Sequence, residues 1–199
     1  MVETTSRRDP DPIEVGWVAG ILDGEGSCGL YEVRNKGNGT QSLGIKISVT
    51  STEFSLLRRL SEIYSRWGVH YYYTLNRHQG KKGREHWHDS VAITVCRINS
   101  VVRLLRIVLP YLTCKKPRAE LILEFAEWKQ ASRFNDRDWE RDWHGRRLPH
   151  KARTEEEIAK EMSFLERFRQ LPAKQPKIAL STTIRRGSQP IRLKAESMK

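Results

Sequence analysis

The sequence lacks a long apolar run, an apolar signal segment and any pairing pattern of cysteines. No stretch approaches the roughly 18–20 apolar residues that a membrane-spanning helix needs, which argues against a helical membrane protein. The first residues, MVETTSRRDPDP, contain no apolar signal core, which argues against secretion. The three cysteines, Cys28, Cys96 and Cys114, are scattered and favour a reducing compartment. We therefore expect an intracellular protein with no membrane partner.

Acidic residues are also scarce relative to basic ones. Lys and Arg total 36 against 24 Asp and Glu, a formal net charge of +12, while 38% of the 199 residues are hydrophobic. This apolar share is enough for a packed core and excludes a wholly disordered basic chain. The charge excess indicates a polyanionic partner, of which nucleic acid is the commonest.

The charge is unevenly distributed along the chain. Residues 1–130 carry 19 basic and 14 acidic side chains, and residues 131–199 carry 17 and 10. Apolar periodicity is also weaker in the second part, where Lys, Arg, Pro, Gly and Ser dominate from Pro172 onward. We infer a core domain over 12–130, a helical extension over 131–171 and a basic, flexible tail over 172–199.

Apolar periodicity divides the core domain into helices and strands. Asp11 is expected to cap a first helix that Gly24 and Gly26 end. Period-two alternation predicts two hairpins, and helical periodicity predicts the segments around them. The expected elements are a helix from Pro12, strands 27–34 and 42–50, a helix over 52–67, strands 69–77 and 87–96, a helix capped by Asn99, a helix from Pro117 and, in the extension, a helix over 154–170. The predicted fold class is α+β, with the order αββαββα and a four-stranded antiparallel sheet.

Two carboxylates, Asp23 and Glu25, stand at the end of the first helix. The helix dipole is negative there and disfavours acidic groups by about 0.3–1 kcal/mol each. A bound divalent cation would explain them, because hard oxygen ligands suit Mg²⁺. A solvated acidic turn fits the same spacing, since Asp-Gly-Glu-Gly is a short pattern.

The nine residues 18–26, VAGILDGEG, resemble the motif that names the LAGLIDADG homing endonucleases. The resemblance extends over all nine positions, to the flanking Trp17 and Ser27, and to the αββαββα order over about residues 12–130. The chain holds one copy of the motif, and single-motif members of the family act as homodimers. The resemblance implies a site-specific endonuclease that hydrolyses double-stranded DNA at a long, pseudo-palindromic site. It also implies Mg²⁺ or another divalent metal such as Mn²⁺.

The resemblance assigns roles to individual residues. Glu25 occupies the last acidic position of the motif and is the expected metal ligand, together with the backbone carbonyl of Gly24. Asp23 is expected to orient the turn or a neighbouring helix as part of the catalytic centre. The family places a basic residue after the third helix, and Lys115 is the match here, with Lys116 as the alternative. An ammonium at this place would stabilise charge developing on the phosphate.

Small residues line one face of the first helix. Gly16, Ala19 and Gly20 cost helix stability unless something packs closely against them. In the family, two motif helices meet at the subunit interface, so these residues are the expected dimer contact. Close packing of the same face within one subunit is the alternative.

The polar face of the sheet is expected to bind DNA, because antiparallel hairpins fit the major groove. Taken singly, its side chains are ordinary surface groups; together with the missing apolar pattern on that face, they favour a binding surface. The spacing of the three histidines near the second hairpin fits no standard zinc site. The candidate DNA-binding residues are Arg34, Lys36, Asn38, Gln41, Ser42, Lys46, Ser48, Arg77, His78, Gln79, Lys81, Lys82, Arg84, His86 and His88.

Two other functions fit the same features. One is a LAGLIDADG-like DNA-binding regulator that does not cleave, which the intact Glu25 argues against. The other is an RNA maturase that binds its host intron, because a basic sheet and tail would serve RNA as well. The 23 Arg against 13 Lys hint at a GC-rich genome, which favours a bacterium, an archaeon or a phage-infected cell over an organelle.

Overall fold

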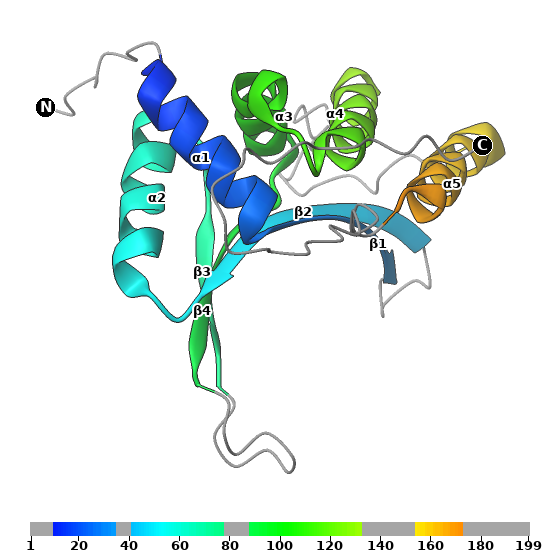
Figure 1. Ribbon diagram of the computed structural model, residues 1–199. Coiled ribbons are helices and arrows are strands. Elements are labelled where there is room, and N and C mark those ends of the chain that lie inside the picture. The colour runs from blue at the N-terminus through cyan, green and yellow to red at the C-terminus, as the bar shows by residue number, and fades with distance from the viewer. Residues whose placement is uncertain (1–9, 35–40, 78–87, 133–153, 173–199) are drawn as a thin grey trace, which may run out of the picture.

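The computed structural model describes residues 10–34, 41–77, 88–132 and 154–172 (Figure 1). The predicted order αββαββα is confirmed, and two further helices follow it. In chain order the elements are α1 (Pro12–Gly24), β1 (Gly26–Arg34), β2 (Gln41–Ser51), α2 (Phe54–Arg66), β3 (Tyr72–Asn76), β4 (Ser90–Val95), α3 (Ile98–Val108), the 3₁₀ turn η1 (Leu109–Tyr111), α4 (Lys116–Ala131) and α5 (Glu155–Gln170).

The strands form one antiparallel sheet in the order β1-β2-β4-β3, as expected for the α+β class. β1 pairs with β2 along the whole length of β1, from Gly26 opposite Val49 to Arg34 opposite Gln41. β4 pairs only with the last part of β2, from Ile47 to Ser51. Figure 1 shows the β1–β2 and β3–β4 ribbons leaving this overlap in different directions. The first half of β2 therefore has an edge that β4 does not cover.

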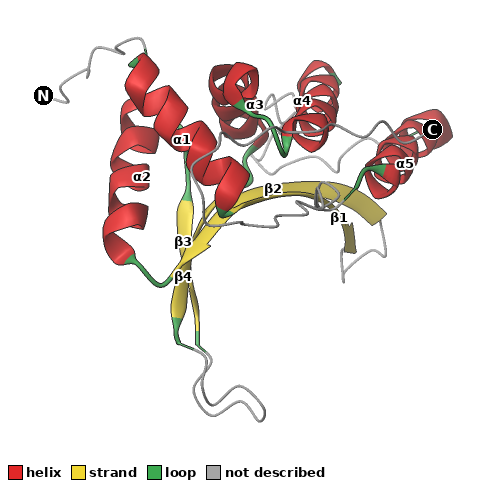
Figure 2. Cartoon of the chain, viewed as in Figure 1, coloured by secondary structure: helices red, strands yellow, loops and turns green. Residues whose placement is uncertain are grey.

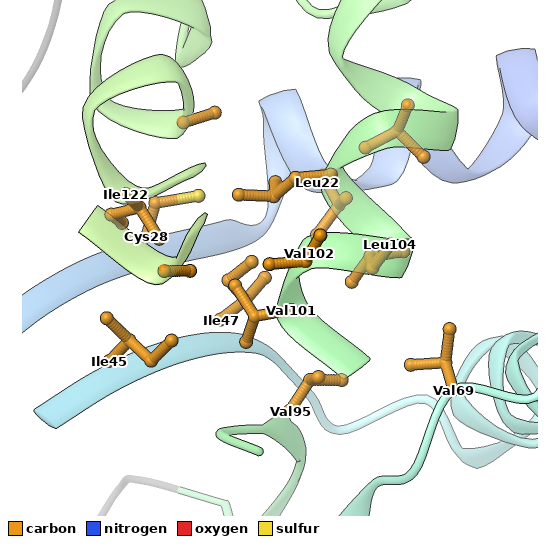
Figure 3. Close-up of a cluster of buried hydrophobic side chains, with 14 of the residues drawn as sticks. Leu22, Cys28, Ile45, Ile47, Val69, Val95, Val101, Val102, Leu104 and Ile122 are labelled. Carbon is orange, nitrogen blue, oxygen red and sulfur yellow. The ribbon is translucent and has the colours of Figure 1, made fainter. Parts of the chain in front are cut away.

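The described helices cover one face of the sheet (Figure 2). The buried side chains of β2 alternate along the strand as Leu43, Ile45, Ile47 and Val49. They pack with Leu22 of α1, Cys28 of β1 and residues of α3 and α4 (Figure 3). This packing follows from the period-two pattern, because a single strand face carries all the apolar residues.

We call the other side of the sheet the open face, because none of the helices in the described part of the chain lies on it. Its residues alternate with the buried ones and follow from the strand register. They are Ser27, Gly29, Tyr31 and Val33 of β1; Ser42, Gly44, Lys46, Ser48 and Thr50 of β2; Tyr72, Thr74 and Asn76 of β3; and Ser90, Ala92 and Thr94 of β4.

The joint between α1 and β1 depends on glycine. Asp11 caps α1 as predicted, with its side chain accepting a hydrogen bond from the Ile13 N–H at 3.0 Å. At the other end, a Cβ on Gly26 would lie 2.4 Å from the carbonyl oxygen of Leu22. Only glycine fits this place without a shift of the backbone, so the last residue of VAGILDGEG is a packing requirement.

The predicted cap of α3 is wrong. The N-cap is Arg97, which makes no side-chain cap hydrogen bond, and Asn99 lies inside the first turn. The Asn99 side chain instead accepts a hydrogen bond from Gln130 of α4 at 2.9 Å. The Asn99 side chain, which local sequence assigns to the cap, thus bonds α4 instead of the backbone of α3.

The helix predicted in the extension is α5, which starts with a capping box between Thr154 and Glu157. Glu161 of α5 is buried and accepts a hydrogen bond from the Leu43 N–H of β2 at 2.6 Å. The same carboxylate forms an ion pair with Lys129 of α4 at 3.0 Å. α5 therefore provides an acceptor for the Leu43 N–H in the part of β2 that β4 does not pair with. The described part of the chain contains no helix long and apolar enough to cross a membrane.

The remaining residues predicted for the extension and the tail, 133–153 and 173–199, lie outside the described residues. What the structure adds is the attachment of α5 to the core. Its apolar side chains Phe164, Leu165 and Phe168 belong to the same buried cluster as the sheet and α4.

Candidate functional site

The candidate site lies where α1 ends. The last carbonyl groups of a helix have no partner within the helix and carry partial negative charge. Here the Lys115 ammonium donates hydrogen bonds to the carbonyl oxygens of Leu22 at 2.8 Å and Asp23 at 2.6 Å. Lys115 is half-buried at the N-terminus of α4. A cation thus offsets the helix dipole at the point where the motif places its acidic residues.

Asp23 makes the reciprocal contacts. Its Oδ2 accepts hydrogen bonds from the backbone N–H and the hydroxyl of Thr113, both at 2.7 Å, and its Oδ1 accepts one from the Lys115 N–H at 2.9 Å. Burial works to raise the pKa of this carboxyl, but the hydrogen bonds from Thr113 and Lys115 outweigh it and lower the pKa. Asp23 is therefore ionised near neutral pH and holds the loop that carries Lys115. We call Asp23, Thr113 and Lys115 the motif clasp.

Glu25 has a different environment from Asp23. Its backbone N–H ends α1 by donating to the Ile21 carbonyl at 2.8 Å, and its side chain is exposed. Among the described residues, none forms a hydrogen bond or ion pair with the Glu25 carboxylate. The motif clasp thus occupies one acid of the pair and leaves the other available to a ligand.

The donor set at this point suits a hard divalent cation. Mg²⁺ commonly keeps several waters and takes one or two carboxylates together with substrate phosphates, without a protein cage. The exposed Glu25 carboxylate and the adjacent Gly24 carbonyl are oxygen ligands of this kind. Within the ranges that the structure describes, no group of three or more His, Cys, Asp or Glu side chains is placed to hold a metal. A metal at Glu25 would need further oxygens from outside this set.

The predicted dimer residues divide between two sides of α1. Ala19 is buried in the core, where it packs within the chain. A Cβ added at Gly16 or Gly20 would meet no atom within 4 Å, and the same holds for Gly24. Ile13, about one helical turn before Gly16, is 77% exposed. One side of α1 therefore presents a flat stripe of backbone next to an apolar side chain.

The structure describes some of the predicted DNA-binding residues, and these differ in exposure. Lys46 is exposed on the open face, and Arg77 and His88 are exposed at the ends of β3 and β4. Ser42 is half-buried on the open face, whereas Ser48 is buried there. The backbones of Arg34 and Gln41 pair at the end of the β1–β2 ribbon. The other candidates, Lys36, Asn38, His78, Gln79, Lys81, Lys82, Arg84 and His86, lie outside the described residues.

Sequence reasoning missed two features of this region. Thr113 is separated from Asp23 by 90 positions, and no local pattern connects the two. Tyr31 of β1 lies on the open face opposite Gly44. Strand alternation from Cys28 or Leu30 would have placed Tyr31 on that face, so in this second case a signal was present.

No protein-family model matches the chain. A search of the curated proteins likewise finds no match. Among solved structures, the homing endonuclease I-CvuI in complex with the I-CreI target is 19% identical, over 58% of this chain and 66% of its own, with a TM-score of 0.45. The group I intron-encoded homing endonuclease I-CeuI, complexed with DNA, is 14% identical over 66% of this chain and 62% of its own, with a TM-score of 0.47.

The homing endonuclease I-TnaI is 13% identical, with a TM-score of 0.43, over 59% of this chain and 77% of its own. The similarity spans just under two thirds of the I-CvuI and I-CeuI chains. These neighbours are homing endonucleases, the family whose motif residues 18–26 resemble.

Proposed function

We propose that the chain is a site-specific, double-strand DNA endonuclease that acts as a homodimer with a divalent metal ion, Mg²⁺ or Mn²⁺. The observation that carries the proposal is that the end of α1 holds both an exposed, unengaged Glu25 carboxylate and the Lys115 ammonium, which is bound to the carbonyl oxygens of Leu22 and Asp23. A free acid and a fixed cation at the end of the VAGILDGEG helix are the groups that phosphodiester hydrolysis needs.

The exposed side of α1 at Gly16 and Gly20 supports the homodimer. Gly16 and Gly20 leave room for a second backbone, and a second copy of α1 would cover the exposed Ile13. A two-fold contact of this kind uses the same patch on both subunits. It would bring the two copies of Glu25 together and double the carboxylates available to metal.

Each residue of the site has a distinct task in this proposal. Glu25 provides carboxylate oxygens to the metal, whose chemistry is to activate water and to neutralise the charge of the reacting phosphate. Lys115 stabilises negative charge on the phosphate from a position that its bonds to α1 fix in advance. Asp23 is a positioning residue, because it touches the loop of Lys115 and not the substrate.

The open face is the proposed DNA surface. None of the described helices lies on it, and it carries the exposed Lys46 in the middle of β2, whereas its β4 residues Ser90, Ala92 and Thr94 are buried. Two-stranded antiparallel ribbons fit the major groove of B-DNA. The net charge of +12 adds an attraction to phosphate that does not depend on base sequence.

Cleavage tests the proposal. The substrate is double-stranded DNA of the locus into which the protein's own gene is inserted, in the form that lacks this insertion. The protein is incubated with it in Mg²⁺ or in EDTA. We expect double-strand cutting with Mg²⁺ that EDTA abolishes, and that Glu25→Gln abolishes while DNA binding persists. Glu120→Gln, which removes an exposed carboxylate of α4, is the matched control and should cut normally. Tight DNA binding by the unmodified protein without cutting would contradict the proposal and support a regulator; binding of intron RNA in preference to DNA would support a maturase.

The dimer is tested separately by sedimentation. Gly20→Leu adds a bulky side chain to the open side of α1 and should produce a monomer. Ala159→Leu places the same leucine side chain at an exposed position of α5 and should leave a dimer. A dimeric Gly20→Leu protein that still cuts would contradict the assigned interface.

A further inference from the structure

The open face of the sheet is largely uncharged. Of its residues, as defined above from the described strands, Lys46 alone carries a charge. Besides Lys46, its large exposed side chains are aromatic: Tyr31 is 45% exposed and Tyr72 is 47% exposed. A surface for a polyanion that carries exposed rings offers apolar contacts as well as charge.

The ring of Tyr31 is seated on a glycine. Tyr31 pairs with Gly44 across the β1–β2 ribbon. A Cβ on Gly44 would lie 2.7 Å from Cζ, 2.9 Å from Oη and 3.0 Å from Cε2 of Tyr31. The end of the ring therefore lies directly over the Gly44 backbone, in space that any other residue would fill. The far side of the ring stays accessible, as the exposure of Tyr31 shows.

The groups near the Tyr31 hydroxyl agree with this placement of the ring over Gly44. Burial raises the pKa of the Tyr31 hydroxyl, and the nearby Cys96 and Tyr72 raise it further. Cys96 directly follows β4 and Tyr72 begins β3, so the side chain points from β1 toward the other half of the sheet. Tyr31 thus occupies the open face beside Lys46, held in place from below.

We propose that Tyr31, seated on Gly44, is a specificity-determining residue that contacts the 5-methyl group of a thymine in the major groove. This inference rests on the proposed function, because it requires the open face to bind double-stranded DNA. The thymine methyl is the apolar group that base pairs display in the major groove. A ring already fixed against the sheet loses little conformational entropy on contact, so even a small apolar contact discriminates.

Replacement of thymine by uracil tests the contact without changing the protein. Binding sequences are first selected from a randomised double-stranded DNA library, and each thymine of the selected site is then replaced singly by uracil, which lacks the methyl group. We expect one thymine in each half-site at which the replacement weakens binding about fourfold, which corresponds to about 0.8 kcal/mol for one buried methyl. At other thymines the dissociation constant should not change.

Three variants locate that effect on the protein. Tyr31→Ala should bind thymine and uracil DNA equally at the sensitive position, while Tyr31→Phe should keep the fourfold difference. Gly44→Ala displaces the ring and should reduce the difference although Tyr31 is intact. Tyr73→Ala is the matched control: Tyr73 is an equally exposed ring on the opposite face of the sheet and should leave the difference unchanged.

The outcomes separate the two proposals. Failure of the unmodified protein to select any double-stranded DNA would overturn the proposed function. Selection of a site with no uracil-sensitive thymine would overturn the Tyr31 contact alone. A uracil effect that persists at full size in both Tyr31→Ala and Gly44→Ala would overturn it as well, because the methyl group would then be bound elsewhere.

Discussion

One buried carboxylate joins α5 both to the sheet and to α4. Glu161 is 2% exposed, accepts the Leu43 N–H at 2.6 Å and pairs with Lys129 at 3.0 Å. Glu161→Ala removes both interactions at once. It leaves the Leu43 N–H of β2 without its acceptor and the Lys129 ammonium without its carboxylate.

The size of the loss follows from these two contacts. A hydrogen bond to a charged group contributes about 1.5–3 kcal/mol, and removing one partner of a buried ion pair costs about 3–5 kcal/mol. Lys129 retains the rings of Phe125 and Trp128 at 5.7 and 5.4 Å, and its side chain is 12% exposed, which lessens the penalty. Because both losses arise from the same carboxylate, they overlap and do not add, and we expect the free energy of unfolding to fall by about 3–4 kcal/mol in Glu161→Ala, the lower half of the range for a broken buried pair.

Urea denaturation measures the loss, with Glu166→Ala as the control. Glu166 is an exposed carboxylate on the same helix, and its removal should change stability by less than about 0.5 kcal/mol. Amide hydrogen exchange adds a local measurement, because the Leu43 N–H should lose protection only in Glu161→Ala. The reasoning is refuted if the two variants unfold alike and the protection of Leu43 is unchanged.

Three further measurements test the packing and the motif clasp. Gly26→Ala should lower the free energy of unfolding by about 1–3 kcal/mol, and with it the thermal midpoint, because the added Cβ meets the Leu22 carbonyl oxygen. Gly24→Ala, whose Cβ would meet no atom within 4 Å, should leave the midpoint unchanged. The folded-state pKa of Asp23 lies below its unfolded value, so Asp23 contributes stability above about pH 4. That contribution is lost as pH falls through the folded pKa, and the stability difference between the protein and Asp23→Asn should shrink below pH 4 in acid titration. Burial raises the pKa of Cys28 to about 11, so an alkylating reagent at pH 8 should label the exposed Cys114 and spare Cys28 in mass spectra.

The sequence was sufficient for the order of elements, because apolar periods mark several of them and caps or glycine stops mark others. The alternation through Leu43, Ile45, Ile47 and Val49 predicts a one-sided strand, and the structure buries these four residues. It could not show that β4 covers only half of β2. The extent of this pairing depends on where the β3–β4 ribbon diverges from β2, which is a property of the assembled sheet.

Contacts between distant segments account for the rest. Asn99 has the composition of a helix cap, but it bonds Gln130, which only tertiary packing brings close. Likewise the sequence placed Lys115 after the third helix but could not show what its ammonium binds. The hydrogen bonds to α1 became visible once α4 and α1 were positioned together. Local patterns are blind to such pairs because their energy is gained only on folding.

Helix geometry explains why the two acids of the motif act separately. Residues two apart on an α-helix project about 200° from one another, so they do not face a common site. Asp23 accordingly meets Thr113 and Lys115 of its own chain, while Glu25 projects to the exterior. Within the described residues, one chain therefore offers one unengaged carboxylate at this end of α1, and not a pair. In the proposed enzyme, the remaining oxygens would come from the Gly24 carbonyl, from water, from the DNA phosphates and from the Glu25 of a second copy, so dimerisation would serve the chemistry as well as the length of the DNA site.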